Sequence, residues 1–289
     1  MKCKCLTLLL VLTSLIGYSQ TAKKEISMDA VKRKSNTIVL IHGLFLNNTS
    51  WSKWKAYFEE KGYRVYAPAY PGHEGNPSDL RRHIHPDLTG TGLEDVVKKM
   101  EELIDSLPEK PIVIGHSMGG LVVQKLIEAD KAIAGVSIDG APPKNVMPPL
   151  STFKISWPAV NFFKSNSKAY LGSREWYHKA FFNNFSESES NQLYEQLTVP
   201  ESRKIVKQSA LNSFAKVDFK KVQRPLLFIA GEKDAFFSPG FTQKIAQKYQ
   251  DKNHSRVDYK MFKSRSHYIC GEENWQEVAA YINNWINNL

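Results

Sequence analysis

"PIVIGHSMGGLVVQKLI", residues 111–127, is the stretch that decides the fold of this chain. It begins with a short apolar run typical of a buried strand and ends with apolar residues at helical spacing. Between the two runs Ser117 has Gly115 two positions before it and Gly119 two positions after it. A sharp strand-to-helix turn strains its central residue, and side chains at the flanking positions would collide with it, so both flanks need glycine. The stretch therefore predicts a strand, a tight turn with Ser117 at its tip, and a helix.

The rest of the chain repeats this alternation on both sides of the turn. Apolar, β-branched runs predict strands, and amphipathic runs with capping residues or a terminal glycine predict helices. The predicted strands lie within 37–43, 63–72, 111–115, 132–140, 224–234 and 256–262, and the predicted helices within 47–62, 92–107, 121–130, 238–250 and 275–289. Alternation of this kind indicates an α/β fold, a parallel sheet with helices on both faces.

The alternation breaks between residues 144 and 216. This segment has no clear strand and is rich in aromatic residues: Phe153, Trp157, Phe162, Phe163, Tyr170, Trp176, Tyr177, Phe181, Phe182, Phe185 and Tyr194. We interpret it as a mostly helical cap inserted into one α/β core, which then comprises residues 20–143 and 217–289. Any single ring is more often part of the cap's own core, but a segment that packs on the sheet edge should bring some rings to a site there.

The N-terminus has a different pattern. Lys2 and Lys4 precede a run of apolar residues from Leu6 to Ile16, followed by small residues. This is the pattern of a secretory signal peptide, predicted at 1–19, and the apolar run is too short to cross a hydrocarbon core about 30 Å thick. We therefore expect a periplasmic or secreted protein with no stable membrane anchor after cleavage.

Cleavage would leave Cys270 as the one cysteine, so no intramolecular disulfide is expected and the core must supply the stability. Cys270 is interpreted as a small buried apolar residue, with a redox-sensitive thiol as the alternative.

The chain carries a net charge of +10. A basic protein can adhere to anionic surfaces or nucleic acid, but the lysines are scattered and no nucleic-acid motif is present. A solvated basic surface is therefore favoured, and no nucleic-acid partner is expected. The oligomeric state is left open.

Ser117 has the sequence context of a nucleophile. A helix that begins directly after it brings backbone N–H groups and the positive end of the helix dipole beside its oxygen. A serine hydroxyl also needs a base, itself held by a third group. His267 lies after the last predicted strand and before the last helix, at the sheet edge where the serine emerges, and it is our candidate base. His116 is assigned to support of the turn.

Two aspartates compete for the role of the acid. Asp234 follows the strand that precedes the histidine, which agrees with the chain order serine, acid, histidine. Asp139 also ends a strand at the same edge and stays as the alternative. Glu232 lies closer to its strand, in the turn itself. Asp234 is favoured.

Backbone N–H groups should stabilise an oxyanion. Met118, directly after the serine, is one predicted donor. The second is Leu44 in "HGLF", with Phe45 as a weaker alternative, and Gly43 is the residue that lets this backbone approach the substrate.

These motifs together resemble a known superfamily. "HGLF", "YPGHEG", "GHSMGG", "GEKDAFFSP" and "SHYICGEENW" occur in the order and spacing found in α/β-hydrolases, over roughly residues 36–289. The chain looks like the capped serine esterase and lysophospholipase-like branch. The resemblance implies a mostly parallel eight-stranded sheet with helices on both faces and a helical cap insertion. It also implies a Ser117–Asp234–His267 triad, no metal and no organic cofactor.

The predicted function is that of a serine hydrolase that cleaves carboxylic esters with apolar acyl or aryl groups. Serine at the turn disfavours enzymes with an aspartate nucleophile, such as haloalkane dehalogenases and epoxide hydrolases. An acyltransferase, a cofactor-free haloperoxidase-like enzyme and a carbon–carbon hydrolase could use the same triad and stay open. A non-catalytic binding protein is disfavoured, because such proteins commonly lose one triad residue.

Overall fold

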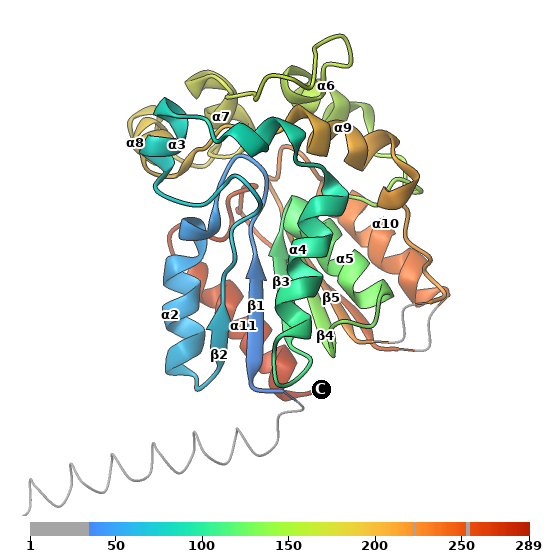
Figure 1. Ribbon diagram of the computed structural model, residues 1–289. Coiled ribbons are helices and arrows are strands. Elements are labelled where there is room, and N and C mark those ends of the chain that lie inside the picture. The colour runs from blue at the N-terminus through green and yellow to red at the C-terminus, as the bar shows by residue number, and fades with distance from the viewer. Residues whose placement is uncertain (1–34, 222–223, 253–254) are drawn as a thin grey trace, which may run out of the picture.

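The computed structural model describes residues 35–221, 224–252 and 255–289 (Figure 1). The predicted signal peptide, residues 1–19, lies outside these ranges, so cleavage and export stay predictions. No helix in the described ranges is both long enough and apolar enough to cross a bilayer.

A parallel sheet forms the centre of the core. Its strands are β1 (Thr37–Ile41), β2 (Arg64–Tyr66), β3 (Ile112–His116), β4 (Ala134–Ile138), β5 (Leu226–Gly231) and β6 (Val257–Phe262). They lie in the order β2-β1-β3-β4-β5-β6, and every neighbouring pair is parallel. Each strand coincides with a predicted strand, although β3 ends one residue beyond its predicted range and β2 is much shorter than the run that predicted it.

The eight strands implied by the family resemblance are not confirmed. The described residues form a sheet of six strands. Outside these six, the described segments either have helical spacing or are loops rich in proline, glycine and polar residues, so they offer no further apolar run that could extend the sheet.

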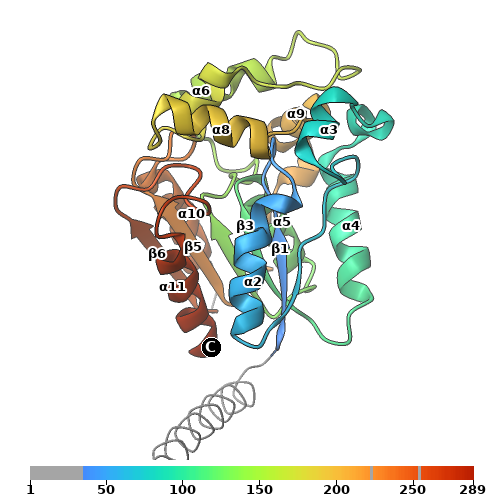
Figure 2. The same ribbon diagram turned by 90° about the vertical axis from the view of Figure 1, so that its left-hand side faces the viewer.

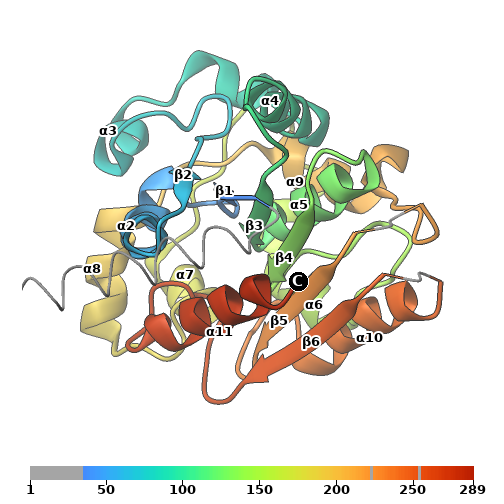
Figure 3. The ribbon, with the colours of Figure 1, turned by 90° about the horizontal axis from the view of Figure 1, so that it is seen from below.

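Helices cover both faces of the sheet, as the sequence predicted (Figure 3). One face carries α2 (Ser52–Glu60) and α11 (Trp275–Asn287), and the other carries α4 (Leu93–Asp105), α5 (Met118–Glu128) and α10 (Pro239–Gln250). Successive strand residues point to opposite faces, so in β1 Ile38 and Leu40 pack with the first group of helices, whereas Val39 and Ile41 pack with the second. This double burial explains why the strands are continuous apolar runs.

Four helices lie between β4 and β5 and cover the end of the sheet at the top of Figure 1, a placement also visible in Figure 2. They are α6 (Leu150–Val160), α7 (Arg174–Ala180), α8 (Glu187–Leu197) and α9 (Arg203–Leu211). All lie inside the segment 144–216 expected to form the cap, whose boundaries stay a prediction. A short helix from the core, α3 (Pro77–Arg82), packs beside α8, and its Arg81 donates hydrogen bonds to backbone oxygens of the cap.

The strand order marks the carboxyl ends of β1 and β3 as the expected place of a binding site. The chain passes from β1 to β2 on one side and then returns to β3 on the other, so β1 and β3 lie side by side but continue to opposite sides. Ligands of open parallel sheets bind at such a switch point, beyond the carboxyl ends of the strands. Gly43 and Leu44 follow β1 there, and Ser117 follows β3.

Candidate active site

Ser117 occupies the turn between β3 and α5 in a backbone conformation that is rare for a residue with a side chain. Its φ is 55° and its ψ is −119°. The Ser117 N–H donates to the carbonyl of Ile138 at 2.9 Å, and the Ser117 carbonyl accepts from the Ala141 N–H at 2.8 Å. These bonds tie the turn to β4 and the loop after it, and so hold a conformation that costs about 1–3 kcal/mol by itself.

The glycines around Ser117 are needed because the chain passes so close. A Cβ atom on Gly115 would lie 2.1 Å from the carbonyl oxygen of Gly119. A Cβ atom on Gly119 would lie 2.2 Å from the carbonyl oxygen of Ile41, so this glycine makes room for the end of β1 and not for the serine itself. A Cβ atom on Gly43 would lie 2.9 Å from Cβ of Ser117.

Three side chains predicted from separate parts of the sequence meet at this turn. His267 Nε2 lies 3.0 Å from Ser117 Oγ, and His267 Nδ1 lies 3.0 Å from Asp234 Oδ2. The other carboxylate oxygen of Asp234 accepts hydrogen bonds from the N–H groups of Phe236, at 2.7 Å, and Phe237, at 3.1 Å. The structure thus brings the hydroxyl, imidazole and carboxylate into one line of hydrogen bonds.

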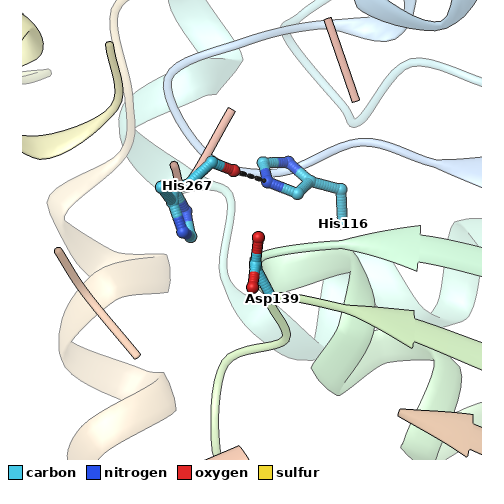
Figure 4. A group of neighbouring side chains, drawn as sticks. All are labelled: His116, Asp139 and His267. Atoms are coloured by element: carbon cyan, nitrogen blue, oxygen red, sulfur yellow. Dashed lines mark hydrogen bonds between the residues drawn. The ribbon is translucent and has the colours of Figure 1, made fainter. Parts of the chain in front are cut away.

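His267 is fully buried, and its surroundings hold it in place. Its backbone carbonyl accepts a hydrogen bond from His116 Nε2 at 2.7 Å (Figure 4). Burial, and then the neighbouring His267 ring, lower the pKa of His116 to about 3, so His116 is a neutral donor. The rings of Phe236 and Phe181 lie 4.6 Å and 5.3 Å from the His267 ring. His116 therefore contacts the backbone of the candidate base, and its predicted support of the turn stays a prediction.

Asp139, the alternative acid, lies close to the same imidazole but is held differently. It is fully buried, and its Oδ1 accepts from the Gly231 N–H at 2.7 Å, while Oδ2 has no hydrogen-bond partner among the described residues. Burial raises the pKa of Asp139 well above its usual value, and the charge of Asp234 raises it further. The two carboxyl groups therefore differ in their contacts: Asp234 bonds to His267, whereas Asp139 bonds to the Gly231 N–H and its raised pKa disfavours the charged form. Glu232 accepts from the Ser264 N–H, away from this line.

His116, Asp139 and His267 also form a cluster whose potential metal-ligand atoms lie within 4.8 Å of one another (Figure 4). Both ring nitrogens of His267 are already engaged with Ser117 and Asp234. Burial and the charge of Asp234 also raise the pKa of Asp139, which disfavours the ionised form that metals bind. We therefore assign no metal to this cluster.

Backbone N–H groups near Ser117 are available to an oxyanion. Met118 is the first residue of α5, so no carbonyl of its own helix can accept from its N–H. The Leu44 N–H has no hydrogen-bond partner in the described part of the chain. The Phe45 N–H, the weaker candidate, already donates to Glu201 Oε2 at 3.1 Å. Leu44 thus remains the better candidate for the second donor.

Glu201 is a residue that sequence reasoning missed. It is fully buried, and besides Phe45 it contacts His73, whose Nε2 lies 3.1 Å from its Oε2. Burial lowers the pKa of His73, but the charge and hydrogen bond of Glu201, together with the Pro71 carbonyl and the charge of Glu74, raise it by more, so the net shift is upward. Glu201 thus fastens two loops to the cap, the loop after β1 through Phe45 and the loop after β2 through His73. No motif marks Glu201, because its partners are 128 and 156 positions away in the chain.

A cavity of about 390 Å³ opens beside Ser117. Leu44, Ser117 and Met118 lie in its wall, together with the cap rings Phe153, Phe162, Trp176 and Phe181. The wall is mostly apolar, and the volume is within the range of sites that hold small molecules. As expected, some cap rings reach the site, whereas others, such as Tyr177 and Phe182, are fully buried in the core.

Cys270 is buried three positions after His267, and burial raises the pKa of its thiol well above the usual value. This agrees with the interpretation of Cys270 as a small packing residue.

Comparison with known proteins gives the same fold over nearly the whole described chain. Residues 38–281 match the alpha/beta hydrolase family. A putative esterase/lipase of Mycoplasma genitalium is 24% identical over 258 residues, which are 83% of this chain and 86% of that protein. The crystal structure of a Paleococcus ferrophilus monoacylglycerol lipase superposes with a TM-score of 0.64 at 20% identity, covering 87% of this chain and 94% of that one. An extracellular alpha/beta-hydrolase from a Paenibacillus species superposes with a TM-score of 0.65 at 20% identity, covering 86% and 98%. The chain therefore belongs to the alpha/beta hydrolase family.

Proposed function

We propose that this protein is a serine esterase that cleaves carboxylic esters with apolar acyl or aryl groups through an acyl-enzyme intermediate. The observation that carries the proposal is the line of hydrogen bonds from Ser117 Oγ through His267 to Asp234, at 3.0 Å for each step, in the wall of an apolar cavity. A hydroxyl, an imidazole and a carboxylate in this order are the parts that nucleophilic acyl transfer requires.

In the first half of the reaction, His267 Nε2 accepts the Ser117 proton as Oγ attacks the ester carbonyl carbon. Asp234 holds the imidazole with its Nδ1 proton inward and stabilises the imidazolium that forms. The carbonyl oxygen becomes an oxyanion, which the N–H groups of Leu44 and Met118 stabilise. His267 then protonates the leaving alcohol, and the acyl group stays on Ser117.

Water completes the reaction in the same site. His267 takes a proton from the water as its oxygen attacks the acyl carbon, and the proton returns to Ser117 Oγ when the carboxylic acid leaves. No step needs a metal or an organic cofactor.

The cavity wall supports the substrate class. Apolar side chains of the core and of the cap surround the space beside Ser117, and burying an acyl or aryl group there is favourable by roughly 25 cal/mol per Å² of apolar surface. The names of the relatives, an esterase/lipase and a monoacylglycerol lipase, also support ester hydrolysis as the reaction class. The N-terminal pattern of residues 1–19 supports export as the setting of this activity.

Hydrolysis of p-nitrophenyl esters, from acetyl to palmitoyl, tests the proposal. We expect Ser117→Ala to reduce kcat by at least about 10³-fold with the fold unchanged, because no other group can take up the acyl chain. Ser156→Ala is the matched control, since Ser156 lines the same cavity but has no part in the relay, and it should keep its activity within about threefold. Ser117→Ala with activity near that of the wild type would overturn the serine mechanism.

A further inference from the structure

The cap carries an exposed apolar surface around the cavity. Six large apolar side chains are exposed there: Met147 (75%), Leu150 (77%), Trp157 (43%), Phe162 (40%), Phe163 (90%) and Leu211 (56%). All of them come from α6, the loops on either side of it, and the last residue of α9, which lie together at the top of Figure 1. Among the described residues, the other exposed large apolar side chain is Ile84, on a different loop. Single exposed apolar residues are ordinary, but a gathered set marks an interaction surface.

The outer face of α6 carries part of this exposed apolar surface. Leu150, Lys154 and Trp157 follow one another at spacings of four and three residues, so they share a face, and all three are exposed. A helix on a protein surface normally carries polar residues on its outer face. Here that face combines two large apolar side chains with a lysine, the combination found in helices that lie in a membrane interface.

The two segments that carry these apolar residues contain only basic charged residues. In residues 141–173 the charged side chains are Lys144, Lys154, Lys164 and Lys168, and no acidic residue occurs. In residues 202–217 they are Arg203, Lys204, Lys207 and Lys216, again without an acid. Lys204 lies 3.8 Å from Asp95 Oδ2 of α4. The side-chain amines of Lys154 and Lys168, which are exposed, have no ion-pair or hydrogen-bond partner in the described part of the chain. By contrast α8, on the other side of the cap in Figure 1, carries Glu187, Glu189 and Glu195.

The same surface borders the candidate site. Met147, Phe162 and Leu211 are exposed, and they also line the cavity that reaches Ser117. An apolar molecule could therefore pass from this surface to the candidate nucleophile along apolar side chains.

We propose that this cap surface, formed by α6, its flanking loops and the end of α9, docks reversibly on a lipid surface with anionic headgroups and takes apolar ester substrates from it. Trp157 and Phe163 would lie at headgroup level, and the lysines would contact the anionic groups, each contributing attraction that salt weakens. Such docking is peripheral and needs no membrane-spanning helix. A second copy of this chain is a poorer occupant, because a symmetric contact would bring the unpaired lysines of two copies together.

The substrate route rests on the proposed esterase function, whereas the docking itself can be measured without activity. Flotation with vesicles of phosphatidylcholine alone, or of phosphatidylcholine with 30% phosphatidylglycerol as roughly the anionic content needed for a strong surface potential, measures it directly. The full chain is expressed, and the N-terminus of the purified protein is read by mass spectrometry, since an uncut apolar leader would bind lipid itself. Wild type and variants share the same N-terminus, so differences between them report on the cap.

We expect tighter binding to the anionic vesicles, reduced by salt. Lys154→Glu with Lys168→Glu should weaken it at least about 30-fold, and Leu150→Ser with Phe163→Ser at least about tenfold. Lys53→Glu with Lys244→Glu is the matched control, because these exposed lysines lie on α2 and α10 and change the net charge equally; it should weaken binding less than about threefold. None of the six residues lines the cavity, so turnover of p-nitrophenyl acetate should stay unchanged in all variants.

Several results would overturn the docking proposal. Equal binding to both vesicle types, or equal losses in the cap and control lysine variants, would remove the specific role of the basic cap. No binding, together with a dimer in sedimentation that Leu150→Ser with Phe163→Ser dissociates, would assign the surface to a second copy. Ser117→Ala separates the two proposals, since it should abolish turnover and leave vesicle binding unchanged.

Discussion

The two buried aspartates near His267 allow a sharp test of the relay, because the same substitution should lower kcat strongly in Asp234 and leave it nearly unchanged in Asp139. Asp234 accepts from two backbone N–H groups through Oδ1 and faces His267 Nδ1 through Oδ2. In Asp234→Asn, the amide oxygen must replace Oδ1 to accept the hydrogen bonds from the Phe236 and Phe237 N–H groups. The NH₂ group then faces His267. Turning the amide around would leave the N–H groups of Phe236 and Phe237 unpaired, at about 1–3 kcal/mol each.

An NH₂ group opposite Nδ1 forces the imidazole proton onto Nε2, where it blocks acceptance of the Ser117 proton. The corresponding change in chymotrypsin-like proteases lowers kcat about 10⁴-fold, and we expect a loss of this order here, about 5.4 kcal/mol of transition-state stabilisation. Asp139 makes no hydrogen bond to His267; burial raises its pKa, and its Oδ1 accepts from the Gly231 N–H, as an amide oxygen also can. Asp139→Asn should therefore keep kcat within about fivefold of the wild type.

The assay is the initial rate of p-nitrophenyl butyrate hydrolysis at pH 7.5 by the wild type and both variants, with circular dichroism to verify folding. A loss of about 10³-fold or more in Asp139→Asn, with Asp234→Asn near the wild type, would reverse the assignment of the acid. Near-wild-type rates in both variants would refute the tautomer argument altogether.

Two further predictions concern stability. Gly115→Ala should lower the free energy of unfolding by about 2 kcal/mol or more, because the new Cβ would overlap the Gly119 carbonyl oxygen. Chemical denaturation measures this, with Gly240→Ala as the control, since a Cβ at Gly240 enters open space in α10 and should be neutral or stabilising. Equal effects in the two variants would contradict the packing argument. The His73–Glu201 pair should make stability fall with rising pH. The pKa of His73 is higher in the folded chain than its ordinary value of 6.5, so the pair's contribution is fully present below about pH 6.5 and is lost as the pH rises through the folded pKa. Unfolding free energies should then show Glu201→Gln to be about 3 kcal/mol less stable than the wild type at pH 6, with a smaller difference at pH 9; a difference that grows with pH would reject the charged pair.

The sequence alone predicted the elements that depend on local chemistry. Apolar β-branched runs located all six strands, because strands buried on both faces must be apolar along their length. Gly115, Ser117 and Gly119 predicted the tight turn, because few other residues can occupy it. His267 and Asp234 followed from the chain order serine, acid, histidine and from the rule that parallel strands bring their carboxyl ends to one edge. The strand count implied by the resemblance, in contrast, was not confirmed.

The tertiary structure decided what depends on residues far apart in the chain. The turn after β5 decides which aspartate bonds to His267, because its N–H groups orient Asp234. Burial, which only folding produces, raises the pKa of Asp139. The role of Glu201 came from its contacts with Phe45 and His73 and from no pattern of its own. The lysines looked scattered in the sequence, but those of α6 and α9 lie on two helices that pack together beside the cavity. Local propensity and spacing can be read along a chain, whereas pKa shifts, hydrogen-bond partners and surface patches arise from groups that only folding brings together.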